Sequence, residues 1–203
     1  ENAIVSQGES GNYWMLRWNE NNVEGRCRWY ATQDGSNITS IIHNAGGSFN
    51  NNWHHFSTTY DNSTVTLWVD GANVGTASIS NMDCGYWDGF HLRVGTTPYA
   101  ASDAEELPMY GYIDELIISR GIVRHTAAFT PSTTAFTADQ YTTLLMHMDG
   151  SDDGTSFLDA SWTGAPRHTI TANGDVTNQR PQHHTLTANG DAHLIGPKVG
   201  TSV

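Results

Sequence analysis

Residues 52–80 read NWHHFSTTYDNSTVTLWVDGANVGTASIS, and turn signals divide this stretch into short segments. Val65, Leu67 and Val69 alternate along the middle segment, which places them on one face of a β-strand. Asp70-Gly71 then gives a favoured hairpin turn, because both central residues of that turn need a positive φ. The stretch therefore predicts three antiparallel strands, at 53–60, 64–69 and 72–79.

The composition favours many short strands over helices. Of the 203 residues, 37% are hydrophobic and only 15% are charged, and much of the remainder is Asn, Thr, Ser and Gly. Nine basic against twenty-one acidic residues give a net charge of -12. This balance argues against nucleic-acid binding and anionic membrane surfaces, since both need clustered Lys and Arg. The sequence has no apolar run of about 18 residues, so we expect no membrane insertion.

Strand patterns separated by Gly, Asn and Asp clusters continue over residues 1–137. This spacing is typical of an antiparallel all-β sandwich. The further strands are expected at 14–18, 26–32, 38–43, 90–94 and 112–119.

The C-terminal segment, residues 138–203, has a different pattern. A predicted strand at 141–148 runs into an Asp-Gly-rich loop, and the sequence HTITANGD at 168–175 returns as HTLTANGD at 184–191. Each copy predicts a short Thr-rich strand followed by an Asn-Gly turn. We therefore expect a strand-rich extension with a duplicated hairpin strand.

Three motifs follow one another along the first part of the chain. They are Trp53-His54-His55, the hairpin LWVDG at 67–71 and the segment GYIDELIIS at 111–119. In their order and sequence they resemble the laminin-G-like domains of the concanavalin A-like jelly-roll family, and the resemblance implies a jelly-roll β-sandwich over residues 1–137. Similar low-charge domains occur in bacteriophage tail fibres and other virion surface proteins, and in extracellular adhesins and filaments.

The order of the segments is unusual for this family, because residues 138–203 resemble the start of a further laminin-G-like domain. The chain is then a slice of a tandem array, a subunit whose C-terminal strands complete the next subunit's sandwich, or a closed permuted domain. An incomplete sandwich exposes a sheet edge, which a strand from another copy can fill. The expected assembly strand consists of Leu144, Leu145, Met146, His147 and Met148.

Four aspartates in the Asp-Gly-rich loop are candidate calcium ligands. Oxygen ligands at short spacing suit Ca²⁺, and the resemblance implies one ion near the first and last of them. An Asp-Gly turn without metal explains the same residues. The candidates are Asp149, Asp152, Asp153 and Asp159.

A catalytic site is not expected. Asp114 and Glu115 lie side by side in a predicted strand, so they point to opposite faces, whereas a retaining glycosidase needs two carboxyl groups on one face. The same geometry prevents His54-His55 from chelating one ion together. A glycan hydrolase is therefore the least favoured function.

Tyr86, Trp87 and Asp88 form the expected glycan-binding site. An exposed Trp beside polar acceptors can stack on a sugar ring while its neighbours bond the hydroxyl groups. Core packing or a contact between subunits explains these residues equally well. The only two cysteines, Cys27 and Cys84, form a disulfide if the protein matures outside a reducing cytosol, and are otherwise inert thiols.

These observations predict a non-enzymatic structural or adhesion module of a virion fibre or extracellular appendage. Its expected partners are cell-surface glycan and other copies of itself. The alternative is a self-assembling extracellular filament subunit, joined head-to-tail by strand complementation.

Overall fold

The computed structural model contains β-strands and no helix among the residues that it describes. Accordingly, none of these residues belongs to a helix that could cross a membrane. The strands fall into two compact units, of which the first comprises Glu1–Ile113 with Gly121–Ala135 and the second includes Asp114–Arg120 with Phe136–Asp175. The described residues are 2–9, 11–19, 23–46, 52–80, 82, 92–97, 109–150, 156–161 and 169–171.

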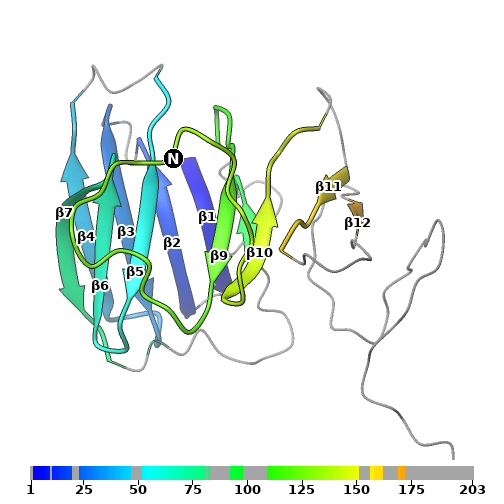
Figure 1. Ribbon diagram of the computed structural model, residues 1–203. Helices are drawn as coiled ribbons and strands as arrows, with labels where there is room; N and C mark the ends of the chain where they lie inside the picture. The colour runs from blue at the N-terminus through cyan, green and yellow to red at the C-terminus, as the bar shows by residue number, and fades with distance from the viewer. Residues whose placement is uncertain are drawn as a thin grey trace, which may run out of the picture. The chain divides into compact units, whose positions relative to one another are not determined.

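A five-stranded antiparallel sheet forms one layer of the first unit (Figure 1). Its first four strands follow one another as a meander, and the fifth pairs with the free side of the first. The predicted strands in this sheet are confirmed to within a few residues, whereas its first strand is not predicted by the sequence pattern. The strands are β1 (Asn2–Glu9), β2 (Asn12–Trp18), β3 (Arg26–Thr32), β4 (Ile38–Asn44) and β8 (Leu92–Val94).

A three-stranded antiparallel sheet forms the second layer of this unit. It consists of β5 (Phe56–Tyr60), β6 (Thr64–Val69) and β7 (Ala72–Ser78). The predicted hairpin turn between β6 and β7 is confirmed, since φ is 51° at Asp70 and 79° at Gly71. The backbone N–H of Asp70 also donates to the carbonyl of His55 at 2.8 Å, which fastens this turn to the residues before β5.

The hydrophobic core lies between these two sheets. Leu67 of β6 has no exposed surface and Trp29 of β3 exposes 1%. Burying one such side chain contributes about 1.5–3 kcal/mol. The predicted β-sandwich is therefore confirmed. The buried side chains of this core are Val5, Leu16, Cys27, Trp29, Ala31, Ile41, Val65, Leu67 and Val69.

Part of the outer face of the five-stranded sheet, on β2 and β3, is buried as well. Arg17 of β2 lies opposite Arg28 of β3. Their guanidinium groups lie over the ring of Tyr30, 5.0 and 4.8 Å from its centroid. Met15 has no exposed surface and Arg17 exposes 7%. The two cation–π contacts keep these charges on an apolar surface.

The second unit is built from two strand pairs. β9 (Leu116–Ser119) pairs antiparallel with β10 (Thr142–Met146), and β11 (Ser156–Leu158) pairs with β12 (Thr169–Thr171). The N–H of Ala160 donates to the carbonyl of Leu145 at 2.7 Å, so the chain after β11 attaches to β10. β12 confirms the strand predicted in the first copy of the repeat, and the second copy lies outside the described residues.

The expected assembly strand lies largely in β10. Leu144, Leu145 and Met146 pair with β9 of the same chain, and His147 and Met148 follow directly. Exchange of this strand between copies stays a prediction. The same holds for a domain boundary after residue 137, although the structure groups residues 114–120 with the C-terminal segment.

Candidate functional site

Several residues expected to carry function lie outside the described part of the chain. They include the glycan-binding candidates Tyr86, Trp87 and Asp88, as well as Cys84. Cys27 lies at the centre of the core with no disulfide partner among the described residues, and burial raises the pKa of its thiol to about 12. Such a thiol is inert at neutral pH. Its pairing with Cys84 stays a prediction.

Two of the four calcium candidates are described, and the structure gives them different surroundings. Asp149 is exposed. Asp159 accepts hydrogen bonds at Oδ1 from the backbone N–H groups of Leu145, at 3.1 Å, and Ser161, at 2.8 Å. The described residues contain no group of three or more side chains that could hold a metal ion. Asp152 and Asp153 lie outside those residues, so calcium binding stays a prediction.

The acidic pair Asp114-Glu115 lies before β9 and not within a strand, which corrects the prediction from sequence. Glu115 has a left-handed backbone with φ of 53°. Its Oε1 is 2.8 Å from Nδ1 of His147, and its Oε2 accepts the backbone N–H of Phe136 at 2.8 Å. The Glu115 carboxylate therefore joins the residue before β9 to the residue after β10 and to Phe136 in the connection between the two strands. Asp114 is exposed.

Trp53 is the most exposed tryptophan among the described residues, with 68% of its surface accessible. Its neighbours are held firmly in place. Nδ1 of His54 lies 2.8 Å from Oδ2 of Asp70, and the N–H of His55 donates to Oδ1 of Asp70 at 2.9 Å. The ring of His54 also stacks on Trp18 with centroids 6.5 Å apart. Trp53 thus presents its ring to solvent from an anchored backbone.

Two tyrosines near the end of the first unit are exposed even further. Tyr110 exposes 83% and Tyr112 exposes 85% of their surfaces. The segment that carries them is tied to the five-stranded sheet, because the N–H of Met109 donates to the carbonyl of Gly95 at 2.7 Å. Both rings are therefore accessible to a ligand, and the segment that carries them is attached to the sheet at Met109.

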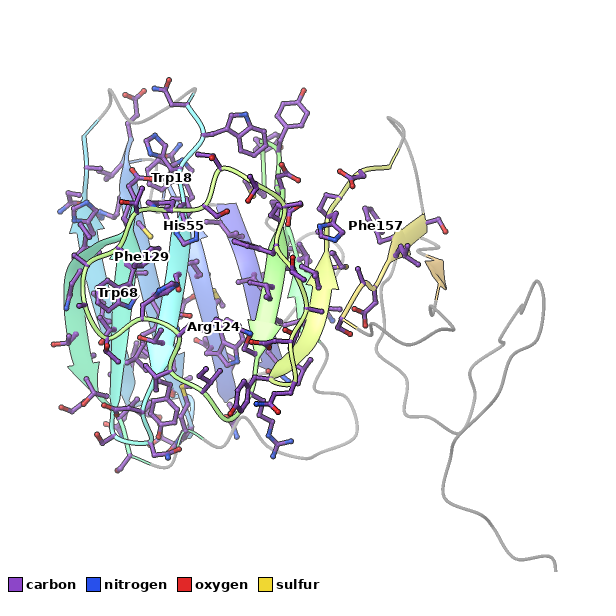
Figure 2. All side chains as sticks on the ribbon, viewed as in Figure 1. Trp18, His55, Trp68, Arg124, Phe129 and Phe157 are labelled. Carbon is purple, nitrogen blue, oxygen red and sulfur yellow. The ribbon has the colours of Figure 1, made fainter. Side chains whose placement is uncertain are left out.

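A segment of the first unit, residues 121–135, crosses the three-stranded sheet, and we call it the strap (Figure 1). Figure 2 shows Phe129 of the strap near His55 and Trp68. The centroid of the Phe129 ring is 5.4 Å from that of His55 and 5.9 Å from that of Trp68. The strap explains why Trp68, on the outer face of its sheet, exposes only 3%.

The two histidines at the strap have lowered pKa values. Burial is the main cause at His55, where Asp70 acts in the opposite direction. At His125, burial lowers the pKa first, and the charges of His55 and Arg124 add to the effect. The sequence gives only a weak signal of this aromatic cluster, because His55, Trp68 and the strap residue Phe129 come from three separate segments of the chain.

The fold agrees with the comparison with protein families. The family model for the concanavalin A-like lectin/glucanases superfamily, a laminin G type of domain, matches residues 1–126. The chain belongs to this superfamily. No curated protein and no solved structure matches it.

Membership in this superfamily is compatible with a non-enzymatic binding module. The superfamily includes glucanases as well as lectins, so membership alone leaves the chemistry open. Within this laminin-G-like domain, the exposed rings of Trp53, Tyr110 and Tyr112 are the described groups best suited to contact a ligand.

Proposed function

We propose that this chain is a non-enzymatic adhesion and structural module that binds glycan through exposed aromatic side chains. The observation that carries the proposal is the contrast between two groups of rings. Trp53, Tyr110 and Tyr112 expose 68%, 83% and 85% of their surfaces, whereas Trp29 and Trp68 expose 1% and 3%. Solvent-facing Trp and Tyr rings on anchored backbone are typical of binding surfaces, because one apolar face meets the ligand while a polar edge stays hydrated.

The arrangement of Glu115 supports a role without catalysis. Both oxygens of this carboxylate are engaged by His147 and by the backbone of Phe136. These contacts give the carboxylate a structural role, because they join the residue before β9 to the residue after β10. The low charge content and the resemblance to tail-fibre and adhesin domains support a location on a virion or in the extracellular space.

A glycan array tests this function. We expect the native chain to retain cell-surface oligosaccharides, and the triple variant Trp53→Ala, Tyr110→Ala, Tyr112→Ala to lose about tenfold or more in affinity. Tyr141→Ala is the matched control, because that ring is 36% exposed and lies in the second unit. The variant Trp87→Ala tests the site at Tyr86, Trp87 and Asp88 in the same assay. Retention of no glycan by the native chain would refute the proposal.

A second candidate function is self-assembly by strand exchange. The observation that favours it is the pairing of β10 with β9, since a β10 strand from another copy presents the same hydrogen-bonding groups to β9. Repeated exchange in one direction gives a head-to-tail filament. A 1–137 truncation should then aggregate or unfold, and a separate peptide of residues 138–203 should rescue it. A soluble, monomeric and cooperatively folded truncation contradicts this candidate.

A further inference from the structure

Strand β4 forms an edge of the five-stranded sheet (Figure 1). It pairs with β3 on one side, and on the other side it pairs with no strand in the described part of the chain. All seven of its residues have a partner in β3, without a shift in register. The open side of β4 is therefore a regular template on which one more strand can pair.

The backbone groups on the open side belong to alternate residues of β4. The N–H of Ala45, just after this strand, donates to the carbonyl of Gly25, just before β3, at 2.8 Å. In an antiparallel ladder, residue pairs that exchange hydrogen bonds alternate with pairs that do not. The odd-numbered residues of β4 therefore bond to β3. The N–H and C=O groups that face the open side are those of Ile38, Ser40, Ile42 and Asn44.

The same residues carry an apolar pattern on the outer face of the sheet. Ile38 exposes 51% and Ile42 exposes 49% of its surface, whereas Ile41 faces the core and exposes 5%. Ser40 lies midway between the two exposed isoleucines on that outer face. β4 contains no Lys, Arg, Asp, Glu or Pro, which are the residues that commonly keep an edge strand from pairing with another chain.

The other edge strands of the first unit offer a poorer template. β7 shifts register against β6 and contains Gly75. β8 has only three residues and carries the charge of Arg93. β5 has no exposed large apolar side chain. Short length, charge and irregular pairing are ways in which proteins protect a sheet edge, and β4 has none of them.

A second copy of β4 fits this edge, because the pattern of the strand is symmetric about Ser40. In an antiparallel pair centred on this residue, Ile38 of each copy lies opposite Ile42 of the other. The outward backbone groups of these three positions then make about six hydrogen bonds. Opposite side chains on one face of such a pair lie close enough to pack. The same surface meets itself, so the contact closes as a two-fold dimer.

We propose that β4 pairs antiparallel with β4 of a second copy and joins two five-stranded sheets into one continuous sheet. This interface goes beyond the proposed function and does not depend on it. It also differs from exchange of β10, which runs head-to-tail and remains open, whereas the β4 contact is complete with two copies.

Sedimentation equilibrium of the full chain measures the dissociation constant of the dimer. A salt concentration of about 0.15 M screens the repulsion between two chains of net charge -12. Ile42→Lys places a charge at the centre of the interface from an exposed position. Thr76→Lys is the matched control, because it adds the same charge at an exposed position of the edge strand β7. We expect Ile42→Lys to raise the dissociation constant at least about tenfold, and Thr76→Lys to leave it within about twofold.

Ser40→Pro tests the backbone contact. Proline lacks the N–H that faces the open side at this position, and it leaves the N–H groups that bond to β3 in place. The variant should keep the melting temperature of the monomer while its dimer weakens at least about tenfold. Unchanged dimerisation of Ser40→Pro contradicts pairing through this edge.

Hydrogen exchange of the native chain tests the register without any substitution. The N–H groups of Ile38, Ser40 and Ile42 should exchange slowly only at concentrations that populate the dimer. The N–H groups of the odd-numbered positions should be protected at all concentrations, because they bond to β3. Protection of the outward groups in the monomer, or equal dimerisation of the two lysine variants, overturns the proposal. A chain that stays monomeric up to about 1 mM also overturns it and leaves this edge to a strand of another protein.

Discussion

The imidazole of His125 stacks on the ring of Phe129, with centroids 3.6 Å apart and planes 8° from parallel. Both residues belong to the strap, and both rings face Trp68 of β6. His55 completes the cluster from the segment before β5, with its ring 5.4 Å from Phe129. The strap is therefore fastened to the sheet through two titratable rings and one phenyl ring.

Acid should weaken this attachment. The pKa values of His55 and His125 lie below their ordinary value of 6.5, chiefly because of burial. The neutral rings are thus favoured in the folded state. Their contribution to stability is fully present above about pH 6.5 and is lost as the pH falls through the lowered pKa values. Asp70 opposes the shift at His55, and Arg124 adds to it at His125.

His125→Phe keeps the stacked ring and removes one titrating group. We expect its melting temperature to fall less than that of the native chain between about pH 8 and about pH 5. His43→Gln on β4 is the control and should retain the native pH dependence. An equally steep fall in His125→Phe and the native chain would show that the strap is not the acid-sensitive element.

Replacing Gly71 of the hairpin turn by a residue with a side chain should strongly destabilise the first unit. A Cβ atom at this position would overlap the carbonyl oxygen of Phe129 in the strap, and the N–H of Phe129 donates to the carbonyl of Gly71 at 3.0 Å. Gly46 has a similar φ, 86° against 79°, but a Cβ there meets nothing within 4 Å. A comparison of alanine substitutions at Gly71 and Gly46 therefore separates the effect of backbone strain from that of the clash with the strap.

Urea unfolding of Gly71→Ala and Gly46→Ala measures the difference. Gly46→Ala should lose about 1–2 kcal/mol of unfolding free energy, which is the penalty for a left-handed alanine. Gly71→Ala should lose at least about 1 kcal/mol more, because the strap hydrogen bond is disturbed as well. Equal losses would mean that the strap contributes nothing measurable to stability.

Local patterns in the sequence predict much of this sandwich and miss the parts that depend on distant partners. The strands 26–32 and 64–69 are predicted with the bounds that they have, because alternation and flanking turn residues define them locally. β1 is not predicted, since the stretch NAIVSQGE has a short apolar run and becomes a strand by pairing with both β2 and β8. Its existence is thus decided by neighbours outside its own segment.

The start of β9 is a second case. The segment 112–119 is predicted as one strand, yet the strand begins at Leu116. Glu115 takes a left-handed backbone while its side chain contacts His147, which lies 32 positions later in the chain. No local pattern contains that contact. The exposed rings of Tyr110 and Tyr112 are missed for a similar reason, because aromatic residues beside a predicted strand are ordinarily expected to pack.

Glu115 should be important for the stability of the second unit. Glu115→Ala leaves the N–H of Phe136 and the ring of His147 without this partner, and we expect a loss of about 1–3 kcal/mol. Glu115→Gln keeps an acceptor for Phe136 and should lose less. Asp114→Ala, at the exposed neighbouring position, is the control and should stay within about 0.5 kcal/mol of the native chain. Limited proteolysis between β9 and β10 reads out the result, and equal resistance of all three variants would contradict this role.

Asp159 should stabilise the C-terminal segment without any metal ion. Its Oδ1 accepts the N–H groups of Leu145 and Ser161, so the carboxylate connects the chain after β11 to β10. Asp159→Ala should therefore lose about 1–3 kcal/mol both with and without a calcium chelator. Asp149→Ala, at an exposed position, should melt like the native chain.

A bound ion predicts a different pattern, because an ion held only by the native state adds stability that chelation removes. If chelator lowers the melting temperature of the native chain to that of Asp159→Ala, and Asp149→Ala is destabilised equally, then calcium and not the backbone contact explains the role of Asp159.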